Sequence, residues 1–139
     1  MSIFKEQLIS QVRALDSFGS WSKLSDEELL TQKYVKTKED LKNTPVIADI
    51  DEMVIKDIRL IFEALALAFE RQTGVMCSVI MEMSHEGFGR VAVIADNIVI
   101  GNKYFKDAHR FGYRTLEKLE LDCESMLKKA VETYQYYKK

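Results

Sequence analysis

Two histidines occur in the chain, and each stands five residues before an arginine with glycine in between. One opens the segment "HEGFGR" and the other opens "HRFGYR". Arginine presents a planar fork that fits carboxylate or phosphate oxygens, and imidazole can donate a hydrogen bond to an anion. Glycine lets a backbone approach a ligand closely. The candidate ligand-binding residues in these segments are His85, Gly87, Gly89, Arg90, His109, Arg110 and Arg114.

The same residues also allow a purely structural interpretation. Glycines are typical of tight connections, and a single histidine commonly hydrogen-bonds to a backbone carbonyl group. Metal binding is disfavoured because the sequence contains no HxxxH or CxxC pair. Ser84 beside His85 does not form a catalytic triad, since sequence neighbours point in different directions. The sequence therefore assigns no metal ligand and no catalytic residue, and it favours a protein that is not an enzyme.

Changes of hydrophobic period predict the elements that must position these segments. A capping box at Ser25 and Glu28 starts a short helix, and Gly74 is well placed to end a long one. The predicted helices cover residues 3–15, a stretch after Ser25, residues 51–73 and residues from 115 onward, and the predicted strands cover 75–83, 90–95 and 98–103. The fold class is therefore α+β, with helices packed on a three-stranded antiparallel β-meander in a single domain over residues 1–139.

The last predicted helix carries an apolar stripe, in which Cys123 is expected to be a small core residue. The stripe comprises Leu116, Leu119, Cys123, Met126, Ala130 and Tyr137, and Thr133 interrupts it.

A meander would bring the two histidine segments to the same end of the sheet. The first strand ends there, the second begins there, and the third returns to it. We expect His85, Arg90, His109 and Arg114 to converge at this end, with Lys103 and Lys106 nearby, and to form a positive pocket for an anion.

The second and third strands predict a hairpin whose two faces are both apolar. Asp96 and Asn97 tolerate the positive φ of a two-residue turn. The expected pairs are Ala95–Ile98, Ile94–Val99, Val93–Ile100 and Ala92–Gly101. Either helices cover both faces or a second copy of the chain covers one of them, so a homodimer is one expectation.

Composition excludes several classes of protein. The net charge is −2 and no basic stripe is visible, so nucleic-acid binding is not expected. No apolar run approaches the length of about 18 residues that a membrane span needs, and the first residues lack the pattern of a signal peptide. The 2 cysteines have no CxxC partner, which favours free thiols and a cytoplasmic location.

Several segments together resemble a known family. "VRALDSFGSW", "SDEELL", "ALALAFERQTGVM", "MEMSHEGFGRV" and "DAHRFGYRTLEKL" are similar to the NifX-associated nitrogen-fixation protein family, a domain of unknown function. The likeness covers residues 4–130 and is most specific in "SHEGFGR" and "HRFG". The segments "VIADNIVIGN" and "DLKNTPVIADIDEM" match less well. The resemblance implies a genomic context among nitrogen-fixation genes, and it carries no known activity or catalytic residue.

Three functions remain open after this comparison. The first is an accessory protein of nitrogen fixation, not an enzyme, that assists assembly or trafficking of the nitrogenase iron–molybdenum cofactor. It would bind an assembly protein such as NifX or an anionic precursor, for example an iron–sulfur precursor or homocitrate. The second is a pure interaction module, either a homodimer or an adaptor. The third is a small enzyme acting on an organic acid anion.

Overall fold

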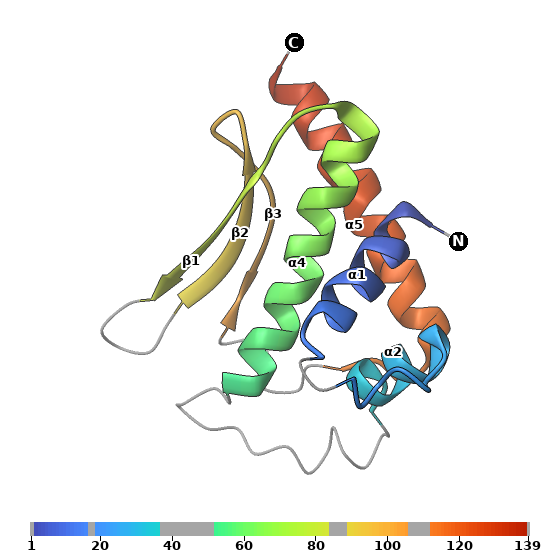
Figure 1. Ribbon diagram of the computed structural model, residues 1–139. Helices are drawn as coiled ribbons and strands as arrows, with labels where there is room; N and C mark the ends of the chain where they lie inside the picture. Colours follow the sequence, from blue (N-terminus) through green and yellow to red (C-terminus); the bar gives the residue numbers. More distant parts are fainter. Residues whose placement is uncertain (1, 17–18, 37–51, 84–88, 106–111, 139) are drawn as a thin grey trace.

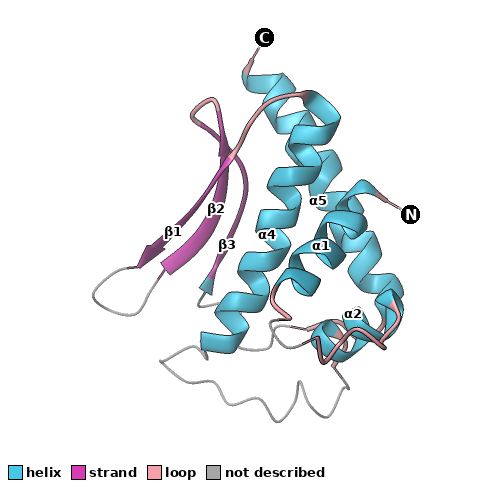
Figure 2. Ribbon diagram, viewed as in Figure 1, coloured by secondary structure: helices cyan, strands magenta, loops and turns pink. Residues whose placement is uncertain are grey.

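The computed structural model describes residues 2–16, 19–36, 52–83, 89–105 and 112–138. Within these ranges the chain forms four helices and one three-stranded sheet (Figures 1 and 2). The elements are α1 (Ile3–Ala14), α2 (Asp26–Tyr34), α4 (Glu52–Thr73), β1 (Ser78–Met83), β2 (Gly89–Ala95), β3 (Ile98–Tyr104) and α5 (Leu116–Tyr137). The predicted α+β fold class is confirmed.

Local signals in the sequence explain where several elements begin and end. The hydroxyl groups of Ser2, Ser25 and Thr115 each accept a hydrogen bond from a backbone N–H in the first turn of α1, α2 and α5. Gly74 follows α4 with a φ of 77°, a left-handed conformation that glycine adopts without steric cost. The predicted cap at Ser25 and the predicted end of the long helix are confirmed, and the caps at Ser2 and Thr115 are additional.

The sheet is an antiparallel meander with the strand order β1-β2-β3, as predicted. Asp96 and Asn97 form the turn between β2 and β3 with φ values of 49° and 66°. Strand pairing starts at Ser78, three residues later than predicted, because residues 75–77 run alongside the core without joining the ladder.

The predicted pairing of β2 with β3 is correct only next to the turn. Beyond it, Val93 pairs with Gly101 and Ala92 pairs with Asn102. The expected partners were one residue earlier, because Ile100 is an extra residue at a β-bulge. The alternation of apolar and polar residues does not reveal this bulge, because the bulge depends on how β3 packs against the helices.

The bulge allows β3 to pack closely on α4. A Cβ atom at Gly101 would lie 2.9 Å from Cδ2 of Leu65, so the glycine provides room for the helix. Ile100 is also buried against the helices, with 5% of its surface exposed.

The molecule is built in layers around one core. In Figure 1, α4 and α5 lie against one face of the sheet, and α1 packs on the side of α4 that faces away from it. Among the described residues, no helix covers the other face of the sheet. The fully buried large side chains are Tyr34, Phe4, Phe69, Phe105, Leu8, Leu29, Leu30, Ile58, Ile61, Leu65, Leu119 and Val12. Cys123 is buried as predicted, whereas Tyr137 at the end of the stripe is 65% exposed.

The segment before α5 is attached to the end of α2. The backbone N–H of Tyr113 donates to the carbonyl of Tyr34 at 2.9 Å, and the N–H of Lys36 donates to the carbonyl of Tyr113 at 2.7 Å. The hydroxyl of Tyr34 donates to the backbone carbonyl of Asp57 in α4 at 3.0 Å. These bonds hold Tyr113 beside α4 and α5.

Candidate ligand-binding site

The strand register supports the premise on which the sequence-based site was built. Met83 at the end of β1 pairs with Gly89 at the start of β2, and Arg90 pairs with Tyr104 at the end of β3. The last residues of β1 and β3 and the first residues of β2 therefore lie at the same end of the sheet. His85, Gly87, His109, Arg110 and Lys106 lie outside the described residues, so their convergence stays a prediction.

Arg90 lies at the predicted end of the sheet but is engaged in an ion pair. Its Nε donates to Oε2 of Glu82 at 2.9 Å across the β1–β2 ladder. The hydrogen bond to Glu82 raises the pKa of Arg90 above its ordinary value. Arg90 directly precedes Val91 in β2, and Val91 is buried against the helices. Because successive side chains of a strand point to opposite faces, the side chain of Arg90 is on the face of the sheet that the helices leave open. Part of its charge is already balanced by Glu82.

Arg114 and Gly89 have different surroundings. Arg114 is exposed in the short segment that leads into α5, next to the strand-like bridge of Tyr113. Gly89 is the first residue of β2 and belongs to the ladder with β1. No contact within the described part of the chain joins Arg90 to Arg114.

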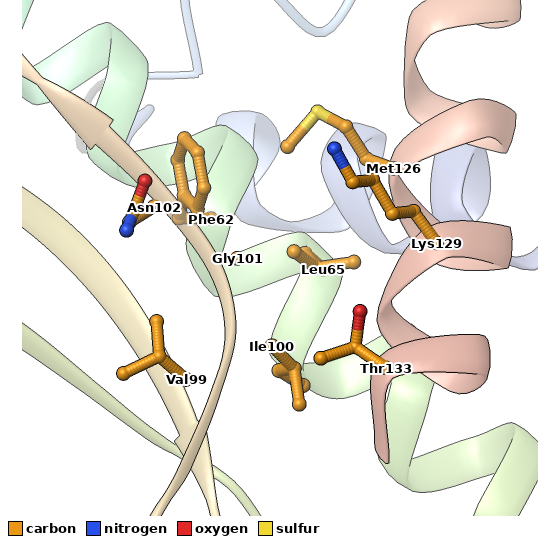
Figure 3. A pocket seen from close by; sticks show the side chains of 9 residues that line it. All are labelled: Phe62, Leu65, Val99, Ile100, Gly101, Asn102, Met126, Lys129 and Thr133. Carbon is orange, nitrogen blue, oxygen red and sulfur yellow. The ribbon is translucent and has the colours of Figure 1, made fainter. Parts of the chain in front are cut away.

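A cavity of about 300 Å³ lies between β3 and α5 (Figure 3). Phe62 and Leu65 of α4 form its apolar floor, and the side chains of Lys129 and Thr133 extend from α5 toward it. The lining residues are Phe62, Leu65, Val99, Ile100, Gly101, Asn102, Met126, Lys129 and Thr133. An apolar floor with a few polar groups is the usual composition of a small-molecule site.

A second cavity of about 210 Å³ adjoins the first toward the end of the sheet at which β3 ends. Its lining residues are Ile58, Ile61, Phe62, Asn102, Lys103, Tyr113, Asp122 and Met126. Three residues, Phe62, Asn102 and Met126, line both cavities. Lys103, which the sequence analysis placed near the predicted pocket, is therefore part of a hollow at this end.

Polar groups in the smaller cavity are partly paired with each other. The hydroxyl of Tyr113 donates to Oδ2 of Asp122. Burial, followed by the hydrogen bond to Asp122, raises the pKa of Tyr113 well above its ordinary value. Tyr113 is therefore a neutral hydrogen-bond donor at physiological pH, and the carboxylate of Asp122 lines the same cavity as Lys103.

Sequence reasoning missed Lys129, Thr133 and Asp122. A signal for Thr133 was present, because it interrupts the apolar stripe of α5. Lys129 stands one helical turn before Thr133 and shares its side of the helix. Neither residue type by itself indicates a cavity, which arises from the packing of α5 against β3.

The cysteines are not activated thiols. Burial raises the pKa of Cys77 to about 11 and the pKa of Cys123 to about 12, so both are protonated near neutral pH. Across the described ranges, no group of three or more histidine, cysteine, aspartate or glutamate side chains could hold a metal ion.

The described helices also bear on membrane insertion. Not one of them combines the length and the apolar composition that crossing a bilayer requires.

Comparison with known proteins places this architecture in a family. A protein encoded in the nifX 3′ region of Rhodobacter capsulatus is 38% identical over 95% of this chain and 84% of its own length. A protein from the nifX–nifW intergenic region of Frankia alni is 34% identical over 89% of this chain and 84% of its own.

A solved structure gives the same result for the fold. The crystal structure of a nitrogen-fixation-associated protein of the DUF269 family, from the cyanobacterium Cyanothece 51142, matches with a TM-score of 0.84 and 32% identity. The match covers 99% of this chain and 90% of that one. The family described as "Protein of unknown function, DUF269" matches residues 21–139. The chain belongs to this family, whose nitrogen-fixation association agrees with the resemblance found in the sequence.

Proposed function

We propose that this protein is an accessory protein of nitrogen fixation that acts by binding a small anion in support of nitrogenase cofactor assembly. The observation that carries the proposal is the pair of adjoining cavities between β3, α4 and α5. They combine an apolar floor with the ammonium groups of Lys103 and Lys129. Asp122 offsets the charge of Lys103 in the smaller cavity, whereas no acidic residue lines the larger cavity with Lys129, which favours a negatively charged ligand there.

The relatives supply the physiological setting of the proposal. Two of them are described by their position beside nifX, and the protein of known structure is described as associated with nitrogen fixation. NifX is the assembly protein that we propose as a partner. Iron–sulfur precursors and homocitrate are anions of this setting, and both are candidate ligands. We place this work in the cytoplasm, because Cys77 and Cys123 are free thiols, as a reducing compartment favours.

The test is to isolate the protein anaerobically from nitrogen-fixing cells and identify released small molecules, iron and molybdenum by mass spectrometry. A variant with Lys103→Met and Lys129→Met should lose the bound anion. The matched control is Lys56→Met with Lys128→Met, which removes the same charge from residues that line neither cavity. The control should keep the ligand. The proposal fails if the wild-type protein carries no anion and takes up neither isolated cofactor nor homocitrate.

The histidine segments require a separate experiment. A variant with His85→Ala and His109→Ala should remain folded and take up less cofactor precursor than the wild type. Uptake equal to that of the wild type would remove the histidines from the site and leave the cavities as the place of binding.

The open face of the sheet favours a second candidate, an interaction module. Ile80 and Ile94 are half-buried on this face, Val99 is 38% exposed, and no described helix covers them. A second copy or NifX is the proposed occupant. Size-exclusion chromatography with light scattering should then show a dimer or a complex that Ile94→Lys disrupts. A monomer that does not bind NifX would contradict this candidate.

A further inference from the structure

We infer that the larger cavity binds a small monocarboxylate with an apolar body, whose carboxylate lies between the ammonium group of Lys129 and the hydroxyl group of Thr133. The inference rests on the proposed binding of an anion and assigns a monocarboxylate to the larger cavity, so homocitrate and iron–sulfur precursors would not be the ligands of this cavity.

The two polar groups of α5 are available for a ligand. Lys129 and Thr133 are four residues apart, so they stand one above the other on the same side of the helix. Both side chains reach toward the space between α5 and β3 (Figure 3). Among the described residues, neither the ion pairs nor the side-chain hydrogen bonds include Lys129 or Thr133. An exposed ammonium group beside an apolar floor and without an ion-pair partner among the described residues can pair with an anion.

The number of charges in the cavity limits the charge of the ligand. Lys129 is the single charged residue among the nine that line it. Thr133 adds an uncharged hydrogen-bonding group, whereas the side chain of Asn102 is on the open face of the sheet with that of its pairing partner Ala92. Lys129 and Thr133 can balance and hydrogen-bond one carboxylate. The second and third carboxylates of a polyanion would lie against apolar side chains without a partner.

The floor of the cavity explains why the rest of the ligand is apolar. Phe62, Leu65 and Ile100 are 4%, 0% and 5% exposed, respectively. Met126 is a flexible and polarizable side chain that adapts to the shape of an apolar group. Gly101 has no side chain, so Leu65 packs directly against the backbone of β3 at this point. Transfer of a hydrocarbon group from water to this surface is favourable.

The size of the cavity favours a short acid. Its volume of about 300 Å³ is at the lower end of the range of ligand pockets. This is the liquid volume of on the order of ten water molecules. A branched aliphatic acid such as 4-methylpentanoate fits this limit and provides a defined probe.

The test measures binding of 4-methylpentanoate by the NMR signal of the Met126 methyl group, in protein labelled with ¹³C-methyl methionine. The signal should shift and saturate with the acid, and it should shift much less with 4-methylpentanamide, which has the same shape and no charge. Lys129→Met should weaken binding of the acid at least about tenfold, since a charge-assisted hydrogen bond is lost. Thr133→Val should weaken it about threefold.

Lys128→Met is the matched control. Lys128 is the neighbouring lysine of α5 and lines a different hollow together with Ser2, Gln72 and Glu132. Its removal changes the net charge equally and should leave the affinity unchanged. Equal loss in the Lys128→Met and Lys129→Met variants would overturn the inference, as would the absence of a saturable shift in the wild type.

Homocitrate as a second probe separates this inference from the proposed function. If homocitrate binds with Lys129-dependent affinity and 4-methylpentanoate does not, the ligand class is wrong while anion binding stands. If 4-methylpentanoate binds as expected and homocitrate does not, the ligand class is supported.

Discussion

Residue-scale interactions fasten the β2–β3 turn to the last turns of α5. Oδ2 of Asp96 accepts a hydrogen bond from the hydroxyl of Tyr134 at 2.6 Å and lies 3.3 Å from Nζ of Lys138. The hydrogen bond from Tyr134 and then that from Lys138 lower the pKa of Asp96. This turn borders the β3 strand that walls the larger cavity, so the contact helps to position that wall.

The lowered pKa of Asp96 predicts a pH dependence of stability. A carboxyl group whose pKa is lower in the folded state stabilises the fold above its unfolded value of about 3.9 and loses this contribution as the pH falls through the folded value. Tyr134→Phe should therefore destabilise the protein more at neutral pH than in acid. Urea unfolding at both pH values measures the difference. Tyr136→Phe is the control, because Tyr136 is 70% exposed. An equal loss at both pH values would contradict this assignment.

Thiol reactivity tests the surroundings of the two cysteines. With pKa values of about 11 and about 12, Cys77 and Cys123 should react slowly with iodoacetamide at about pH 8. Cys77 is half-buried and should be modified before the buried Cys123. Mass spectrometry of peptides after timed labelling gives the order, and labelling in concentrated guanidinium chloride gives the rates of free thiols. Rapid modification of Cys123 in the folded protein would show that α5 packs differently.

At the scale of elements, the sequence predicted what depends on neighbouring residues. The Ser25 cap, the end of α4 at Gly74 and the Asp96–Asn97 turn are local signals, and the structure confirms all of them. The bulge at Ile100 and the cavity beside Thr133 were not predicted, because both depend on contacts between segments distant in the chain. The ion pair of Arg90 with Glu82, eight residues earlier in the chain, was not predicted, because it depends on the register between β1 and β2.

The close approach of β3 to α4 makes Gly101 sensitive to substitution. Gly101→Ala places a methyl group 2.9 Å from Cδ2 of Leu65, and such overpacking costs about 1–3 kcal/mol of the free energy of unfolding. Leu65→Ala alone should cost about 2–5 kcal/mol because it leaves a cavity. The double variant should be more stable than the sum of the two losses predicts. Urea denaturation of the four proteins measures this coupling, and strict additivity would exclude the contact.

At the scale of the whole molecule, the layers are not equally protected from solvent. α4 lies between the sheet and α1, and most of its central residues are buried (Figure 1). β1 is at an edge of the sheet and pairs on one side, within the described residues, with β2 alone. The fold therefore has a protected centre and a sheet that is covered by helices on one face.

Hydrogen exchange should follow this arrangement. Amides in the middle of α4 should exchange most slowly, because their exposure requires global unfolding, and amides of β1 should exchange earlier through local opening. Mass spectrometry of peptides from the exchanging protein resolves the two segments. Exchange of α4 as fast as that of β1 would contradict the central position of this helix.

The position of α1 matters for anyone who shortens the chain. The family match begins at residue 21, whereas α1 occupies Ile3–Ala14 and seals Phe4, Leu8 and Val12 against α4. A fragment that comprises residues 21–139 alone would expose the hydrophobic surface of α4 that α1 covers. Exposed hydrophobic patches of this kind promote aggregation. α1 thus covers one side of the hydrophobic interior, although it lies outside the residues that the family match includes.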